Sequence, residues 1–215
     1  MPFPPSENTL FRGLTIGLAV LAGYIDAIGF LTLGGYFVSF MSGNSTQFAV
    51  GMNDLAAWRQ AAIPFGIITL FVVGVMLGHA LRHVARRPSL AVLTLTTVLL
   101  VAAAVAEEFG LAMLAAPVLT ITMGAANNAF IREGEPTSSV TYVTGTLVKF
   151  GQHFAGWLLG QPNSDWRPFL QLWLGLVGGA ILGAVLYGWW GLPAIWLAAG
   201  LSGGLAAIKW RHPPG

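Results

Sequence analysis

The sequence predicts an all-α integral membrane protein of about six transmembrane helices, built as an inverted 3+3 repeat. Its 215 residues are 55% hydrophobic and only 8% charged, whereas soluble domains carry about 25% charged residues. A soluble fold of this length could not bury so much apolar surface, but a bilayer accepts apolar runs of about 20 residues. Two polar segments interrupt these runs and resemble each other, which indicates the repeat.

The apolar runs set the expected spans. We place them at 10–33, 60–83, 89–107, 111–131, 168–188 and 190–209. The segments 36–52 and 138–160 instead mix apolar residues with Ser, Thr, Asn, Gln and Lys. Backbone at membrane depth stays hydrogen-bonded unless it lines a cavity or is buried in protein. We therefore expect broken helices or re-entrant loops in these two segments.

The two polar segments align with each other without gaps. SFMSGNSTQF (39–48) is aligned with TYVTGTLVKF (141–150). Upstream, AGYIDA (22–27) is aligned with MGAANN (123–128). The offset is about 101–102 residues throughout. A shared order at a shared offset favours an internal repeat over chance similarity between apolar stretches.

Basic residues indicate the orientation. The cluster Arg82–Arg87 makes the link between the second and third spans the most positive in the chain, so this link is expected in the cytoplasm. Counting spans from there places both termini in the cytoplasm. Three spans in each half give the halves opposite orientations. We therefore expect one membrane domain over 1–215, with a first repeat over 10–107 and a second over 111–209.

Composition and motifs exclude several functions. The chain has no cysteine, which excludes disulfides, thiolate metal sites, Fe–S clusters and cysteine nucleophiles. Its basic residues form no one-sided patch, so no nucleic acid is expected as a partner. There is no Ser–His dyad with supporting spacing, no HExxH and no pair of catalytic acids, so we do not expect an enzyme. His79 and His83 lack a third ligand, and we expect neither a metal nor a cofactor.

The strongest candidate site is the pair of polar motifs. Glycine lets backbone approach a ligand or bend sharply, and Ser, Thr and Asn accept hydrogen bonds from the free N–H groups of a helix N-terminus. Two such N-termini from opposite halves would favour an anion or a carboxylate. Helix packing by small residues is the alternative. The candidate substrate-binding residues here are Ser42, Gly43, Asn44, Ser45, Thr46, Thr144, Gly145 and Thr146.

Asp26, Asn127 and Asn128 lie in expected spans, and Lys149 lies in the polar segment 138–160. Asp26 lies within the first span, where a carboxylate costs about 3 kcal/mol or more unless it is paired or solvated. It is a candidate proton relay or substrate contact, and the alternative is a structural cap. Lys149 is a candidate to bind an anion or pair with Asp26, or else to snorkel towards the cytoplasm. Asn127 and Asn128 occupy the place in the second repeat that corresponds to Asp26 in the first. They are candidates to bind solute, and the alternative is that they bridge helices.

Four motifs, GYIDAIGFLTLGG, FVSFMSGNST, MGAANNAF and TYVTGTLVKFGQ, resemble the YoaK family of bacterial membrane proteins, a family of unknown function. The resemblance covers roughly Leu14 to Ile208. Members of the family commonly carry Gln-Asn where this chain has Asn127-Asn128, and Arg where it has Lys149. The resemblance implies a six-helix, multi-pass protein of the bacterial inner membrane, and it supplies no substrate.

These observations predict a membrane transporter or channel for a small solute. An anion or carboxylate is favoured, the site is expected between the two repeats, and proton coupling is left open. The alternative is a non-transporting membrane scaffold or receptor, with an intramembrane enzyme less favoured. The expected partners are the lipid bilayer and a small-molecule or ion substrate, and a homo-oligomer is left open. A cavity lined by both motifs would favour transport, whereas dry packing would favour the scaffold.

Overall fold

A computed structural model describes residues 5–53, 58–132, 135–136, 143–162 and 164–212. These residues are almost entirely helical. The α-helices are α1 (Pro5–Thr32), α2 (Met41–Gly51), α3 (Trp58–Val84), α4 (Pro88–Glu108), α5 (Ala115–Ala126), α6 (Val143–Leu158), α7 (Arg167–Trp190) and α8 (Ile195–Arg211). The 3-10 helices η2 (Ala112–Leu114) and η3 (Leu192–Ala194) precede α5 and α8, and β1 (Ile131–Arg132) pairs antiparallel with β2 (Glu135–Pro136).

Within the described residues, five helical segments are long and apolar enough to cross a bilayer. They are Thr9–Thr32, Gln60–Val84, Pro88–Glu108, Arg167–Trp190 and Leu192–Arg211. Each coincides with an expected span to within a few residues. Large apolar side chains such as Met76, Val98 and Ile181 are more than half exposed on these helices, as lipid-facing side chains would be. The fold is that of a multi-pass, all-α membrane protein.

The expected span at 111–131 is wrong in length. Its helix, α5, has 12 residues and ends at Ala126, so it rises about 18 Å against the roughly 30 Å of a bilayer core. Two asparagines end it. The Asn127 side chain donates to the carbonyl oxygen of Met123 at 2.8 Å, and that of Asn128 donates to Val75 on α3 at 3.0 Å. Asparagine side chains compete with the backbone for helical hydrogen bonds.

The polar segment at 36–52 is broken, as expected. The chain leaves α1 through a turn at Gly34 and Gly35, whose φ angles are 66° and 111°, conformations that glycine adopts without a steric penalty. A non-helical link of residues 33–40 then leads into the 11-residue helix α2.

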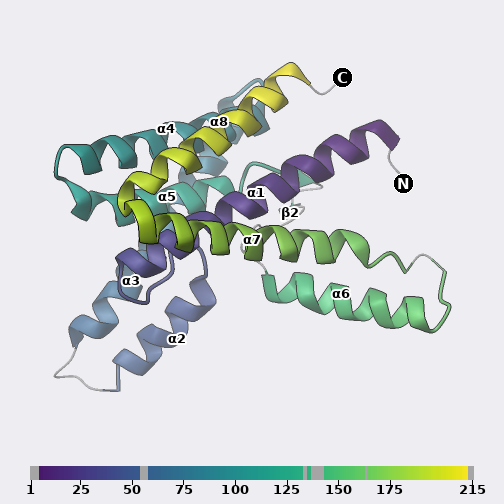
Figure 1. Cartoon of the computed structure of the whole chain (residues 1–215), viewed down its shortest axis with the longest axis horizontal. Helices are drawn as coiled ribbons and strands as arrows, with labels where there is room; N and C mark the ends of the chain where they lie inside the picture. Colours follow the sequence, from purple (N-terminus) through teal and green to yellow (C-terminus); the bar gives the residue numbers. More distant parts are fainter. Residues whose placement is uncertain (1–4, 54–57, 133–134, 137–142, 163, 213–215) are drawn as a thin grey trace.

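The polar segment at 138–160 is described only from residue 143. Residues 138–142 lie outside the described part, and α6 then runs for 16 residues. It packs along α7 and extends beyond the rest of the bundle (Figure 1). α6 is shorter than the five candidate spans.

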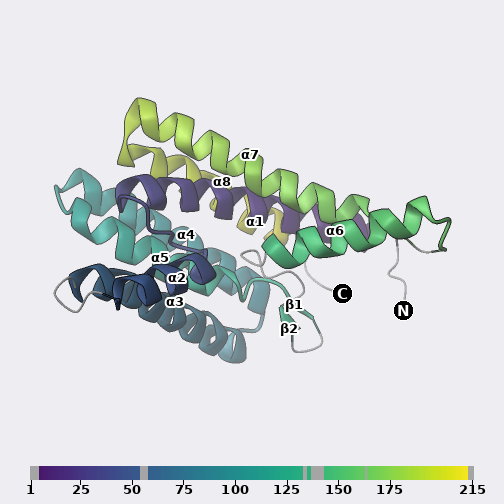
Figure 2. The same ribbon diagram turned by 90° about the horizontal axis from the view of Figure 1, so that it is seen from below.

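Six of the described helices pack in three pairs. α1 lies along α7, α3 along α5, and α4 along α8, as the two views in Figures 1 and 2 show. The first half of the chain is thus joined to the second in every pair. The start of α1 and the end of α8 lie on the same side of the bundle (Figure 1).

Glycines bring α1 and α7 into backbone contact. A Cβ atom added at Gly23, Gly179 or Gly183 would overlap a carbonyl oxygen of the facing helix. The oxygens belong, in the same order, to Leu176, Val20 and Tyr24. No larger residue could replace these glycines without moving the helices apart.

The same set of contacts joins α3 and α5. A Cβ atom added at Gly124, Gly74 or Gly78 would overlap a backbone oxygen of the partner helix. The oxygens belong, in the same order, to Phe71, Ile121 and Ala125. Gly124 lies 101 residues after Gly23, and Gly179 lies 105 residues after Gly74, so each contact has a counterpart in the other pair.

Candidate functional site

A cavity of about 500 Å³ lies where α1, the link before α2, the start of α6 and α7 meet. Its polar lining comes from Asp26, Ser39 and Thr144. Most of the remaining wall is apolar, with phenylalanine rings from α1 and the link and small or aliphatic side chains from α6 and α7: Phe30, Phe37, Phe40, Leu147, Leu176, Ala180 and Ala184. The cavity therefore offers a few polar groups in an apolar surround, which is the usual character of a small-molecule site.

Asp26 connects α1 to the link. One carboxylate oxygen, Oδ1, accepts the backbone N–H of Val38 at 2.9 Å and that of Ser39 at 2.8 Å. These two N–H groups have no helical partner, and such groups must be satisfied at membrane depth. Bonds from N–H groups to a carboxylate are charge-assisted and stronger than neutral ones. Asp26 thus has the structural role that was the alternative to a relay, and it also lines the cavity.

Asn44 also holds this link through side-chain hydrogen bonds. Its side chain is fully buried. Nδ2 donates to the carbonyl oxygen of Phe37 at 2.6 Å, and Oδ1 accepts the Phe37 N–H at 3.1 Å. The side chain of Gln47 donates to the carbonyl oxygen of Gly35 at 2.9 Å. Asn44 therefore shapes the link, and it is not part of the described cavity wall.

The other residues of the first motif lie on α2 away from the cavity. The hydroxyls of Ser45 and Thr46 are exposed and donate to carbonyl oxygens of their own helix, those of Met41 and Ser42. Gly43 lies against the rings of Phe37 and Phe40. The motif reaches the cavity through Ser39 and Phe40, the two residues just before α2.

The second motif reaches the same cavity at the start of α6. Val143 and Thr144 are part of the wall, and Gly145 is buried beside them. Thr146 is outside the described lining.

The pairing of Lys149 with Asp26, one of the alternatives for this residue, is not seen among the described residues. Lys149 is exposed, and among the described residues it makes no ion pair with Asp26 and does not line the cavity. Its position on α6 lies more than a helical turn beyond Thr144, the polar group that does reach the cavity. The structure therefore places no lysine in the described wall.

Asn127 and Asn128 also lie outside the described wall. Asn128 instead bridges helices: its amide reaches Val75, and its own carbonyl oxygen accepts Nη1 of Arg82 at 2.9 Å.

Sequence reasoning missed Ser39 and the three phenylalanines of the wall. Ser39 matches Thr141 in the alignment of the two polar segments, which is a signal that could have added it. The rings of Phe30 and Phe37 lie 4.9 Å apart, and those of Phe37 and Phe40 lie 5.2 Å apart. Aromatic residues are too common in membrane helices for their role to be read from sequence.

The cavity reaches the molecular surface. Leu31 is 45% exposed and Leu147 is 40% exposed, although both line it. Both α2 and α6 begin at its wall, one from each half of the chain. The arrangement suits a solute with one polar or charged group and an apolar remainder.

Comparison with known proteins places the chain in a family. The family model described as "Protein of unknown function (DUF1275)" matches residues 14–208. The chain is similar to the UPF0700 transmembrane protein RA0705 of Rhizobium meliloti, with 38% identity over 195 residues, covering 89% of this chain and 82% of that protein. No solved structure matches the chain significantly. Because the family model covers nearly the whole sequence, the chain belongs to the DUF1275 family of proteins of unknown function.

Proposed function

We propose that this protein is a transporter or channel for a small solute, and that the cavity at Asp26 is its substrate site. The observation that carries the proposal is that both halves of the chain contribute polar residues to the cavity wall. Asp26 and Ser39 come from the proposed first repeat (10–107), and Thr144 comes from the proposed second repeat (111–209). A site between two repeats is the arrangement used by many secondary transporters. The proposed activity moves a solute without chemical change, so we propose no enzymatic activity for this protein.

The glycine contacts support an inverted 3+3 repeat. Each half carries three helices in corresponding places: α1, α3 and α4 in the first, and α5, α7 and α8 in the second. The contacts of α1 with α7 have one-to-one counterparts in those of α5 with α3. If each half crosses the membrane an odd number of times, the halves have opposite orientations. We place both termini in the cytoplasm of a bacterial inner membrane, on the basis of the Arg82–Arg87 cluster.

The favoured substrate is a small anion or carboxylate that moves together with a proton. The N-termini of α2 and α6 lie at the cavity wall, and helix N-termini favour negative charge. Asp26 opposes this when ionised, because two unit charges about 4 Å apart repel by about 4 kcal/mol at an effective dielectric constant of 20. A proton on Asp26 removes the repulsion. Anion and proton would therefore bind as a pair.

Transport into liposomes tests the proposal. Purified protein is reconstituted and given a panel of small carboxylates and inorganic anions, with and without an acidic exterior. We expect at least one anion to accumulate against its gradient when the exterior is acidic. A panel that shows no protein-dependent uptake under either condition would contradict the proposal.

The variant Asp26→Asn tests the role of the carboxyl group. Its amide oxygen can still accept the N–H groups of Val38 and Ser39, so the fold should be kept. Proton-driven accumulation should be lost while solute exchange continues, because exchange needs no net proton movement. Lys149→Gln is the matched control: it removes a charge from an exposed residue outside the cavity and should leave transport unchanged. Normal uphill transport by folded Asp26→Asn would show that Asp26 is only structural.

A blocking variant separates transport from a scaffold or receptor role. Thr144 is exposed at the cavity wall, so Thr144→Phe adds volume there without disturbing a buried contact. We expect the variant to fold and to lose uptake and exchange together. If it transports normally, the cavity is not the route.

A further inference from the structure

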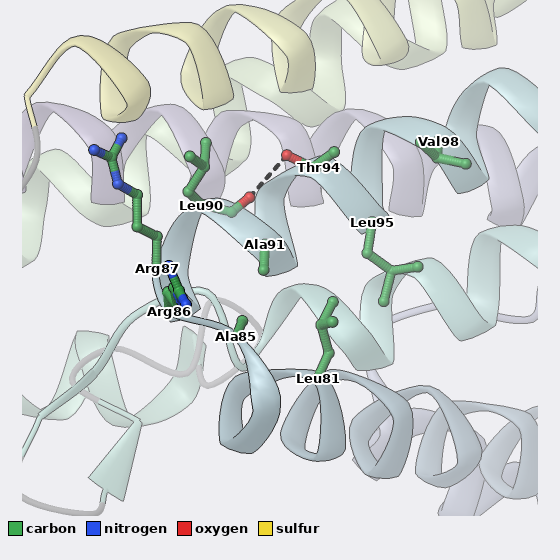
Figure 3. Close-up of a pocket in the computed structure, with 9 residues that line it drawn as sticks. All are labelled: Leu81, Ala85, Arg86, Arg87, Leu90, Ala91, Thr94, Leu95 and Val98. Carbon is green, nitrogen blue, oxygen red and sulfur yellow. Dashed lines mark hydrogen bonds between the residues drawn. The ribbon is translucent and has the colours of Figure 1, made fainter.

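The hairpin between α3 and α4 carries an apolar groove that is separate from the cavity at Asp26. The groove has a volume of about 580 Å³. Leu81 of α3 and Leu95 and Val98 of α4 contribute to its walls, and Arg86 and Arg87 stand at one end (Figure 3). The hydroxyl of Thr94 donates to the carbonyl oxygen of Leu90 at 2.9 Å, so this donor is already satisfied inside the groove (Figure 3).

The guanidinium groups of Arg86 and Arg87 have no partner among the described residues. Both are exposed, and neither has an ion pair or side-chain hydrogen bond within the part of the chain that the structure describes. Arg82, one turn earlier, differs because its Nη1 atom donates to the carbonyl oxygens of Asn128 and Ala129 at 2.9 and 3.4 Å. Arg82 therefore has a structural role, whereas Arg86 and Arg87 are available to a ligand.

The groove has the length of one bilayer leaflet. From Pro88 to Val98 the helix rises about 15 Å, which is half of the roughly 30 Å bilayer core. Pro88 is at the N-terminus of α4, beside the arginines. Val98 is 57% exposed at the far end of the groove. A ligand that fits would carry negative charge at the membrane surface and an apolar chain of leaflet length.

We propose that this groove binds an anionic phospholipid. The phosphate lies between Arg86 and Arg87, and one acyl chain runs along α3 and α4 as far as Val98. Arginine binds phosphate through paired N–H donors. Basic pockets between helices on the cytoplasmic side bind anionic headgroups, and the cytoplasmic placement of this hairpin is the orientation proposed above. The lipid site does not depend on a transport function.

Lipid retention by the purified protein tests the proposal. Native mass spectrometry compares phosphatidylglycerol with phosphatidylcholine of the same acyl chains, added to the protein in detergent. We expect phosphatidylglycerol to be retained in preference. Each arginine near an anionic headgroup contributes about fivefold, so Arg86→Gln/Arg87→Gln should bind it roughly 25-fold more weakly. Equal retention of the two lipids, or unchanged retention by the double variant, would overturn the proposal.

A matched control removes the same charge elsewhere. Lys209 and Arg211 lie in the last turn of α8 and are not part of the groove. Lys209→Gln/Arg211→Gln should keep wild-type retention. An equal loss in this control would mean that net charge, and not the groove, attracts the lipid, and the proposal would fail.

A further variant distinguishes a lipid from a free phosphate. Ala91→Phe fills the groove but keeps both arginines, and should abolish preferential retention of phosphatidylglycerol. If it does not fold, Thr94→Trp serves instead, because Thr94 is exposed at the groove. Glycerol phosphate should not displace bound lipid at equal concentration. Retention that survives the filled groove, or displacement by glycerol phosphate, would indicate a headgroup site without an acyl-chain groove.

Discussion

The helix pairs α1–α7 and α3–α5 share the same backbone contacts at glycines. They differ in the polar residue three positions after Gly23 and Gly124, which is Asp26 in the first pair and Asn127 in the second. In the first pair, Asp26 reaches out of its helix to hold the link before α2, and it lines the cavity. At the matching place in the second pair, Asn127 bonds back to Met123 and α5 ends. Close packing is thus present twice, whereas a carboxylate at a cavity is present once in the described structure. Packing and chemistry can be varied separately, and this makes the comparison testable.

The largest expected effect is on packing. Gly179→Leu should prevent α1 and α7 from meeting, because even a Cβ atom there overlaps the carbonyl oxygen of Val20. Overpacking of a close contact costs about 1–3 kcal/mol for a few added atoms and more for a full side chain. We expect no folded protein by size-exclusion chromatography in detergent.

The neighbouring glycine provides the control. Nothing lies within 4 Å of a Cβ atom at Gly178, so Gly178→Leu should fold. The second pair should show the same contrast between Gly74→Leu and Gly66→Leu, since Gly66 also faces open space. If only one pair is sensitive, the two pairs are not equivalent.

A smaller effect is expected from removing the hydrogen-bond acceptor at Asp26. Asp26→Ala leaves the N–H groups of Val38 and Ser39 unpaired, and both residues are almost completely buried. Each unpaired group costs about 1–3 kcal/mol, so we expect a loss of about 3 kcal/mol in the free energy of unfolding. Asp26→Asn should lose less than about 1 kcal/mol because it keeps the acceptor. Equal losses in thermal unfolding would remove the structural role of Asp26.

Asn44 allows the same comparison within one motif. Asn44→Ala should cost about 2 kcal/mol, because Phe37 loses the partner of both its backbone N–H and its carbonyl group. Ser45→Ala should cost under about 0.5 kcal/mol, since its hydroxyl is exposed and bonds only within its own helix. Chemical unfolding in mixed micelles measures both. Similar costs would mean that Asn44 does not hold the link.

The sequence predicted the features that hydrophobicity determines. The five long spans follow from runs of apolar residues, and the broken segment at 36–52 follows from its polar composition. The short helix α5 could not be predicted, because 111–131 is apolar throughout most of its length and the side-chain bonds of Asn127 and Asn128 end the helix. A polar side chain in a span indicates a buried partner, but it does not say which partner.

The polar residues of the candidate site were predicted only in part, because the sequence does not show which partner a buried polar side chain has. Asp26 and Thr144 do line one cavity. Asn44 was predicted to bind substrate, but its side chain instead bonds to Phe37, seven residues earlier in the chain. This contact depends on how the link folds back and could not be predicted from the sequence. Lys149 could not be placed, because the direction in which α6 leaves the bundle decides whether its side chain reaches Asp26.

The smallest expected effect concerns the pair α4–α8, where the two halves meet through matching residues. The hydroxyls of Thr97 and Ser202 lie 2.8 Å apart, and these residues are 105 residues apart, the same offset as Gly74 and Gly179. Either hydroxyl can donate to the other; that of Thr97 also lies 2.9 Å from the carbonyl oxygen of Leu93, and Ser202 is fully buried. Such interhelical bonds contribute about 0.6 kcal/mol on average in membrane proteins.

We therefore expect Thr97→Val and Ser202→Ala each to lower the free energy of unfolding by about 1 kcal/mol. The double variant should lose less than the sum of the two, because neither hydroxyl is then left without its partner. Thr94→Val is the control on the same helix, since the hydroxyl of Thr94 is exposed and bonds only to Leu90. Strictly additive losses would show that Thr97 and Ser202 are not coupled.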